Sequence, residues 1–150
     1  MSIKMYVKDL MTTNLFIVNE NDKIQSVSNI LHYKHVRHIP VVNNDNILVG
    51  LITFKELLRG LSQNAGDVYA KDIMNSKVIS VEPTTPVIGA LDVMIINKYG
   101  CLPIVDSNKK LLGIISEIDM LRLLYKNCEL PDDWYLDNNG ISFKGTRQNK

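Results

Sequence analysis

The spacing of apolar residues along the chain predicts short strands that alternate with amphipathic helices. Residues 15–18 form a short run of strand-forming side chains, and a polar segment follows them. Apolar residues then recur at helical spacing and predict a helix from about residue 23 to residue 35, with Asp22 as its N-cap. The apolar stripe of this helix consists of Ile24, Val27, Ile30 and Leu31. We expect the stripe to face a sheet.

Two further apolar runs predict a pair of strands joined by a turn. Residues 36–42 and 47–52 are typical of strands, and the residues between them favour a turn. Pro40 cannot donate to a strand ladder, so we expect it at a sheet edge or at the start of its strand. Residues 54–61 predict a short helix. The first unit is therefore β-α-β-β-α.

The same order of elements returns in the second half of the chain. The stretch 113–116 repeats the glycine, apolar pair and hydroxyl of 50–53, which sets the offset between the copies (113 − 50 = 63). Thr85 is expected to cap the long helix of this second unit, with Pro86 at its first position. One such unit cannot bury both faces of its sheet. We therefore expect the two copies to pack as one body, with the natural ligand site in the cleft between them.

Composition and charge narrow the function. The 150 residues are 45% hydrophobic, which suits a globular protein of one domain or two small, intimate ones. The 17 basic and 16 acidic residues leave a net charge of +1, so no overall field attracts nucleic acid or an anionic membrane. Cys101 and Cys128 lack a C-x-x-C partner, and the N-terminal residues carry no apolar signal core. These features predict a cytoplasmic protein.

A hydroxyl residue followed by an acid three positions on opens the last helix of each unit. At Ser116, the first amides of the helix can form an anion site. The same spacing also matches a capping box, which needs no ligand. We favour the capping role for Glu56, because Glu is the preferred acid of that motif. No phosphate-binding loop and no nucleophile beside a base is present, so we expect no enzyme.

In their order and duplication these motifs resemble a pair of cystathionine-β-synthase-type (CBS) domains. The resemblance rests on Asp-hydrophobic-Met at 9–11 and 72–74, Arg-His-Ile-Pro-Val-Val at 37–42 and Gly-Ile-Ile-Ser-x-x-Asp at 113–119. It implies an α+β fold, similar to an α/β sandwich, in which two β-α-β-β-α repeats pack as one pseudo-two-fold module. The expected divisions are repeat 1 at 7–62, repeat 2 at 70–126 and a C-terminal tail at 127–150.

The resemblance implies a regulatory sensor that binds AMP, ATP or a related adenosyl ligand such as S-adenosylmethionine between the repeats. By resemblance, Asp119 would accept the ribose hydroxyls and Ser116 would hold the sugar-phosphate edge. The implied ligand-binding residues are Ser76, Ile79, Cys101, Leu102, Pro103, Ser116, Asp119, Arg37 and His38. The first repeat has Glu where the family has Asp, so its pocket is expected to be weaker. That pocket would comprise Thr13, Phe16, Ile39, Pro40, Thr53 and Glu56.

Partners and alternatives follow from the remaining features. Residues 57–61 and 120–125 are apolar on more than one helix side, and family pairs associate through such helices, so we expect a homodimer. The alternative function is a structural dimerisation module with empty clefts. A regulated partner protein is also expected, and neither nucleic acid nor membrane is. Trp134 is expected to anchor the tail on the body or on a partner.

The histidines raise a metal-binding alternative. His32 and His35 would share a helical face, but no acid or Cys nearby completes a ligand set. We therefore expect no metal and no other cofactor.

Overall fold

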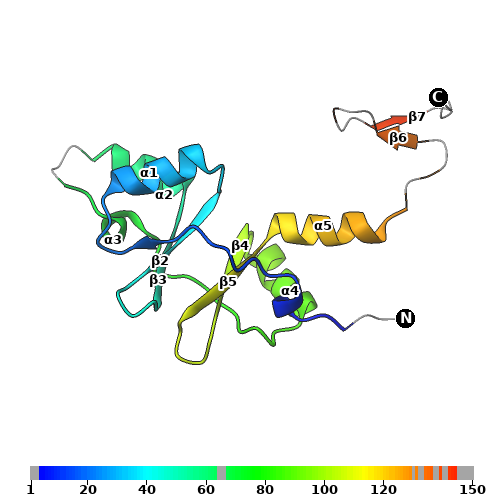
Figure 1. The fold of residues 1–150 in the computed structure, drawn as a ribbon, viewed down its shortest axis with the longest axis horizontal. Coiled ribbons are helices and arrows are strands. Elements are labelled where there is room, and N and C mark those ends of the chain that lie inside the picture. Colours follow the sequence, from blue (N-terminus) through cyan, green and yellow to red (C-terminus); the bar gives the residue numbers. More distant parts are fainter. Residues whose placement is uncertain are drawn as a thin grey trace. The chain divides into compact units, whose positions relative to one another are not determined.

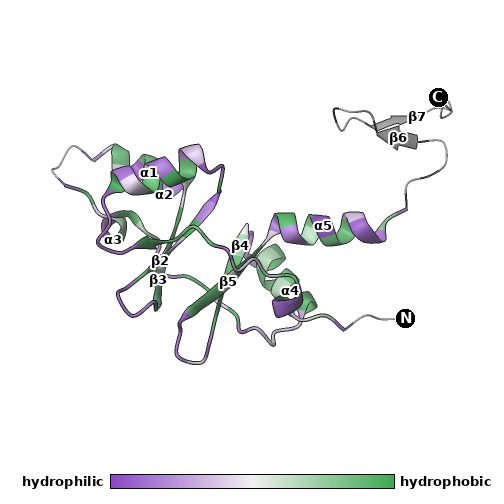
Figure 2. Ribbon diagram, viewed as in Figure 1, coloured by the Kyte–Doolittle hydropathy of each residue, from purple (hydrophilic) through white to green (hydrophobic). Residues whose placement is uncertain are grey.

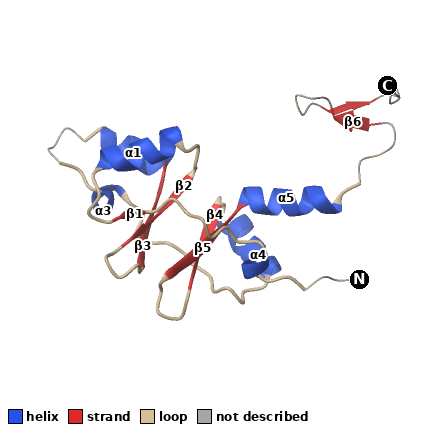
Figure 3. Ribbon diagram, in the orientation of Figure 1, coloured by secondary structure: helices blue, strands red, loops and turns tan. Residues whose placement is uncertain are grey.

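The computed structural model describes residues 4–63, 67–129, 131, 134–136, 139 and 142–144. By its internal contacts the chain divides into two compact units, Met1–Glu117 and Ile118–Lys150. These structural units do not coincide with the two sequence repeats. The helices and strands (Figures 1 and 3) are, in chain order, the 3-10 helix η1 (Val7–Asp9), β1 (Val18–Asn19), α1 (Ile24–Tyr33), β2 (His38–Val42), β3 (Leu48–Thr53), α2 (Phe54–Leu61), α3 (Ala70–Ile73), α4 (Val87–Asn97), β4 (Cys101–Val105), β5 (Leu111–Ser116), α5 (Glu117–Asn127), β6 (Trp134–Leu136) and β7 (Ser142–Lys144).

The first repeat folds around a three-stranded sheet in which β2 is the middle strand. β3 pairs with β2 antiparallel, and β1 pairs with it in parallel over two residues. Helices α1 and α2 contact each other and this sheet. The buried core of the repeat consists of Val18, Ile24, Val27, Ile39, Val41, Ile52, Leu57, Ala70 and Ile73. Since the last two belong to α3, the segment after the linker completes the core of the first repeat.

The second repeat is built in the same way. β4 and β5 pair antiparallel, and their register shifts at Ile104/Val105, the counterpart of the shift at Val41/Val42 in the first repeat. Val81 bridges to Ile104 in parallel, as Val18 does to Val41. Both strand pairs are largely green in Figure 2, and the turns that connect their strands are purple. Apolar strands and polar turns are the pattern that predicted these hairpins.

The two repeats exchange their N-terminal segments. Thr12 bridges to Ile114 in β5, and Asn75, the counterpart of Thr12, bridges to Leu51 in β3, the counterpart of Ile114. Figure 1 shows the blue N-terminal segment running beside β5 and α4. The bridge between Ile47 and Lys110 joins two positions that are equivalent in the two repeats. This reciprocal pairing confirms the predicted α+β fold, in which two β-α-β-β-α repeats pack as one pseudo-two-fold module.

The predicted N-caps of α1 and α4 are both wrong. Asp22 accepts a hydrogen bond from the Asn19 N–H at 2.8 Å, and the N-cap of α1 is Lys23. The reason is a long-range contact: the first amide of α1, on Ile24, donates to the carbonyl of Val68, in the segment just before the second repeat, at 2.9 Å. A side-chain cap is therefore not needed there.

The start of α4 shows the same replacement. The N-cap is Pro86, which the sequence had placed one position inside the helix, and the Thr85 hydroxyl accepts from the Glu82 N–H at 3.2 Å. The first amide of α4, on Val87, donates to the carbonyl of Met5 at 2.9 Å. Helices α1 and α4 thus each begin with a backbone hydrogen bond to the segment that precedes the opposite repeat.

Pro40 lies within the middle strand, so its predicted edge or strand-start position is wrong. Leu51, which lies opposite it in β3, exchanges both backbone hydrogen bonds with Asn75 at 2.9 and 3.0 Å. On the other side, β1 pairs only with Val41 and Val42. Pro40 therefore occupies a position at which no neighbouring strand requires an N–H.

The second unit contains α5 and an antiparallel pair formed by β6 and β7. The predicted role of Trp134 concerns a side chain outside the described set, and residues 137, 138 and 140 of the predicted tail turn also lie outside it. In the part of the chain that the structure describes, no helix has the length and apolar character needed to span a membrane.

Candidate ligand-binding pocket

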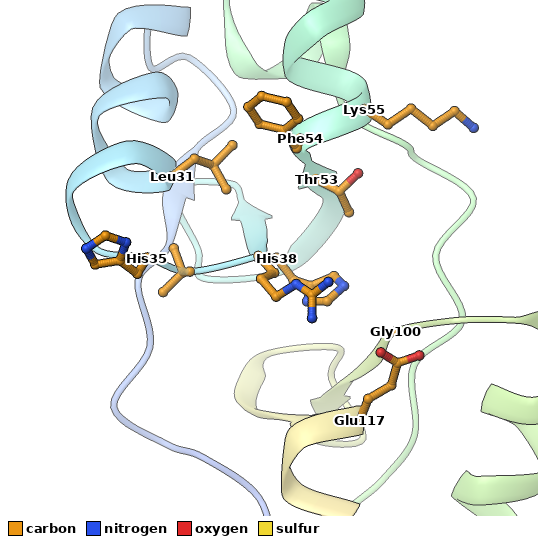
Figure 4. A pocket seen from close by; sticks show the side chains of 10 residues that line it. Leu31, His35, His38, Thr53, Phe54, Lys55, Gly100 and Glu117 are labelled. Atoms are coloured by element: carbon orange, nitrogen blue, oxygen red, sulfur yellow. The ribbon is translucent and has the colours of Figure 1, made fainter. Parts of the chain in front are cut away.

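A pocket of about 560 Å³ lies between the two repeats within the first unit (Figure 4). Ligand sites in proteins typically enclose about 300–1,000 Å³, so its size suits a small organic molecule. The residues that line it are Leu31, His35, Val36, Arg37, His38, Thr53, Phe54, Lys55, Gly100 and Glu117. Eight of them come from the first repeat, and Gly100 and Glu117 come from the second.

The walls of the pocket differ in chemistry. Leu31 and Phe54 supply apolar surface on one side in Figure 4. His38 projects from the start of β2, and Glu117 reaches toward it from the second repeat. Arg37 also lines the pocket, whereas the side chain of Lys55 extends away from His38. The pocket therefore joins an apolar wall to a polar, predominantly basic end.

His38 is half-buried at this polar end and lies opposite Thr53 in the β2–β3 register. Burial of the imidazole and the nearby Arg37 guanidinium lower its pKa from the usual 6.5, while the carboxylates of Glu117 and Glu56 act in the opposite direction. The imidazole is therefore held toward its neutral form at neutral pH.

Gly100 gives the His38 side chain its place in the pocket. A Cβ atom at Gly100 would lie 2.7 Å from His38 Nε2 and 3.0 Å from its Cε1. The backbone of Gly100 is anchored at the same time, because its carbonyl accepts a hydrogen bond from the Glu117 N–H at 3.0 Å. Any larger residue at position 100 requires the imidazole to move.

Thr53 and Glu56 form a capping box at the start of α2, as the sequence predicts. The Thr53 N–H donates to Glu56 Oε2 at 2.9 Å, and the Thr53 hydroxyl donates to the same oxygen. Burial favours the neutral acid, but the hydrogen bonds from Thr53 and from the Glu56 N–H outweigh it and lower the pKa of the carboxyl. The Glu56 carboxylate thus stabilises its own helix.

The predicted ligand-binding residues are distributed over several places. Arg37, His38 and Thr53 line the pocket. Ser76 instead lines a separate cavity of about 170 Å³ in the same unit. Because Asn75 pairs with the first repeat and Thr12 with the second, Ser76 and Thr13 each follow a segment paired with the opposite repeat. Each of the two predicted pockets therefore includes a residue, Ser76 or Thr13, that follows a segment paired with the opposite repeat.

The other predicted residues lie in strands, connecting segments or α5. The buried ones within β2 and β4 are Ile39, Pro40, Cys101, Leu102 and Pro103. Phe16, just before β1, and Ile79, between α3 and α4, have exposed fractions of 42% and 41%. Ser116 ends β5, and Asp119 lies in α5 with its Oδ1 atom 3.9 Å from Arg122 Nη1.

Sequence reasoning missed several residues of the pocket, notably Lys55, Gly100 and Glu117. A signal was available, because Glu117 follows Ser116 just as Phe54 follows Thr53, and Gly100 aligns with Arg37 when the two repeats are superposed in sequence. Aligning the repeats identifies equivalent positions, but it does not say that positions from both repeats line one pocket.

The structure also shows the surroundings of the Cys101 thiol and of the histidines that were considered as metal ligands. Burial, with a smaller effect of Glu117, raises the pKa of Cys101 to about 12, so this thiol stays protonated at neutral pH. His35 has φ 52° and lies beyond the end of α1, so its predicted sharing of a helical face with His32 is wrong. Among the described residues, no three His, Cys, Asp or Glu side chains form a group that could hold a metal ion.

The duplicated β-α-β-β-α body, with a pocket between its halves, defines an α+β module made of two equivalent domains. The family model for the CBS domain matches the chain twice, over residues 7–63 and 70–126. The chain belongs to the CBS domain family and contains a pair of these domains.

Individual relatives agree with this assignment. A CBS domain-containing protein of Dictyostelium discoideum is 30% identical over 139 residues, which cover 85% of this chain and 96% of that protein. The CBS domain pair of protein MJ0100, solved with 5′-methylthioadenosine and S-adenosyl-L-methionine, has a TM-score of 0.76 and 26% identity over 84% of this chain and 100% of that one. CBSX2, solved with AMP, has a TM-score of 0.74 and 26% identity over 81% of this chain and 97% of that one.

Some relatives are much longer than the region they share with this chain. The homoserine O-acetyltransferase of Methanohalobium evestigatum is 25% identical over 119 residues, which cover 79% of this chain but only 24% of that enzyme. The chain thus spans about a quarter of the length of this relative.

Proposed function

We propose that this chain is a regulatory module that binds an adenosyl compound in the pocket between its repeats. The observation that carries the proposal is that His38 lies at the polar end of a pocket of about 560 Å³ whose other side is apolar, and that Arg37, which also lines the pocket, acts electrostatically on His38. An adenosyl ligand has the same two-part character, with a flat base at one end and a polar ribose or phosphate at the other. Two similar CBS pairs were solved with such compounds.

The electrostatics of the pocket favour a ligand that carries a phosphate. Arg37 offers a planar set of N–H donors that suits phosphate oxygens, and His38 gains a second donor when it is protonated. We propose AMP or ATP as the ligand class that uses these groups. Asp119, which the family resemblance implies as a ribose acceptor, is not among the residues that line this pocket and belongs to the second unit, so we propose its role by resemblance alone.

A thermal-shift and calorimetry series with AMP, ATP, adenosine and S-adenosylmethionine tests the proposal. A bound ligand at one hundred times its dissociation constant is expected to add about 2.7 kcal/mol to the free energy of unfolding. Arg37→Ala is expected to weaken AMP and ATP more than adenosine, because it removes charge and leaves contacts to the base and ribose intact. Absence of stabilisation by every compound in the series would contradict the proposal.

A second proposal, that the module forms a homodimer, rests on the outer face of α2. Leu58 and Leu61 lie three positions apart on this face, outside the pocket lining, and are 53% and 55% exposed. A second copy of the chain would cover this face and thereby bury apolar area. Light scattering at micromolar concentration is expected to give twice the mass of one chain, and the mass of a single chain would contradict the proposal.

A further inference from the structure

The position of the His38 side chain depends on residues of both repeats. Its backbone belongs to β2, while its imidazole occupies the space left by the missing side chain of Gly100 in the second repeat. The charged and titratable groups that surround this imidazole come from the loop before β2, from α2 and from α5. Arg37, Glu56 and Glu117 act electrostatically on the imidazole. His35 and Lys55 also line the pocket, and the Lys55 side chain extends away from His38.

These surroundings oppose protonation when no anion is bound. Partial burial penalises the imidazolium, and Arg37 repels it. The carboxylates of Glu117 and Glu56 attract it but do not outweigh these effects, so the pKa of His38 lies below its ordinary value. An anionic ligand group in the pocket would reverse the balance, because it neutralises Arg37 and accepts a hydrogen bond from the imidazolium.

We propose that His38 takes up a proton when an anionic group of the ligand enters this pocket, and that Gly100 is the positioning residue that leaves room for the imidazole there. The inference rests on the proposed function and adds a regulatory property to it. Binding of a phosphorylated adenosyl ligand then depends on pH, whereas binding of adenosine does not.

The direction of the effect follows from linkage. The pKa of His38 is low in the free protein and higher in the complex, so affinity is greatest below the pKa of the free protein. Affinity falls as the pH rises through the pKa of the complex. The expected change is about tenfold in affinity for each unit by which the ligand raises the pKa of His38.

Calorimetry of AMP binding to the full chain tests the inference. Titrations in buffers of different ionisation enthalpy, between about pH 8 and about pH 6, give the number of protons taken up on binding. The AMP phosphate itself titrates near about pH 6, so every measurement is paired with the His38→Gln variant under the same conditions. Adenosine serves as the ligand without an anionic group, and His32→Gln serves as the matched histidine control outside the pocket.

The wild-type chain and His32→Gln are expected to take up protons with AMP but not with adenosine, and His38→Gln is expected to lose this uptake. Gly100→Ala provides a second variant, because the clash involves the outer atoms of the His38 ring, which can swing aside without unfolding the chain. It is expected to keep AMP binding and to reduce the uptake.

The outcomes separate the two proposals. AMP binding by the wild type without proton uptake, or with uptake that persists in His38→Gln, overturns this inference and leaves the proposed function standing. Full uptake in Gly100→Ala overturns the positioning role of Gly100. Failure of the wild type to bind any adenosyl compound overturns the proposed function together with this inference.

Discussion

Two acids at equivalent positions of the repeats are predicted to have different roles. Glu56 and Asp119 occupy the same place in their repeats, and both are acids three positions after a hydroxyl residue. The carboxylate of Glu56 is engaged by the start of its own helix, where the Thr53 amide and hydroxyl both donate to it. A carboxylate that is used in this way stabilises the helix and has less capacity left for a ligand.

Glu56→Ala is therefore expected to lower the free energy of unfolding by about 0.5–2 kcal/mol, as the loss of a helix cap does. Because the pKa of Glu56 is lower in the folded state than its usual 4.5, this contribution is present above pH 4.5 and is lost as the pH falls through the folded pKa. Urea unfolding of the wild type and the variant at several pH values measures the difference. A difference that stays constant into strong acid would contradict the capping role.

Asp119→Ala is the counterpart of this variant. If Asp119 accepts the ribose hydroxyls, losing each charged hydrogen bond costs about 1.5–3 kcal/mol, so adenosine and AMP should bind at least about tenfold more weakly. Glu56→Ala should bind both compounds with little change. Equal losses of affinity in the two variants would show that both acids serve ligands.

At the scale of elements, Gly60 controls how closely α2 packs against its neighbours. A Cβ atom at Gly60 would lie 2.4 Å from Ile73 Cγ2 in α3 and 2.9 Å from Ile24 Cδ1 in α1. Both isoleucines belong to the buried core of the first repeat. The close approach of three helices thus depends on one residue without a side chain.

Gly60→Ala is expected to destabilise the fold by about 1 kcal/mol or more, because overpacking a buried site outweighs the gain in helix propensity. Gly89→Ala is the matched control, since its nearest contact would be Thr85 Cγ2 at 3.9 Å. The control should gain about 0.5–1 kcal/mol. Thermal unfolding of the two variants measures both effects, and a stabilised Gly60→Ala variant would contradict the packing argument.

At the scale of the whole molecule, the two repeats depend on each other. Thr12 pairs with Ile114 and Asn75 with Leu51, so each repeat contributes a segment to the other's strand pair. Ala70 and Ile73 also complete the core of the first repeat. The first repeat therefore does not complete its core alone, and β5 of the second repeat loses its pairing with Thr12 without the first.

Residues 1–63 and 64–150, produced separately, are therefore expected to lack cooperative unfolding and to regain it when they are mixed. Each half alone leaves exposed the apolar surface and the backbone groups that the exchanged segments cover. Circular dichroism during thermal unfolding of each half and of the mixture measures this. A cooperative transition in either isolated half would contradict the interdependence.

The sequence by itself determined the local structure of the chain. The tandem repeat, the two hairpins, the span of α2 and the Thr53–Glu56 capping box follow from the residues themselves, because periodicity and short-range hydrogen bonds relate near neighbours. Of the pocket, the sequence identified Arg37, His38 and Thr53, although Arg37 and His38 were assigned to one predicted pocket and Thr53 to the other.

Only the tertiary structure decided which segments meet. The carbonyl of Val68 replaces the expected Asp22 cap, and the exchange of N-terminal segments interleaves the predicted ligand residues. Gly100 and Glu117 join His38 in one pocket although they belong to the other repeat. These contacts join residues far apart in the sequence. They form because the sheets of the two repeats bury their apolar surfaces together, and no short-range sequence pattern predicts which segments then meet.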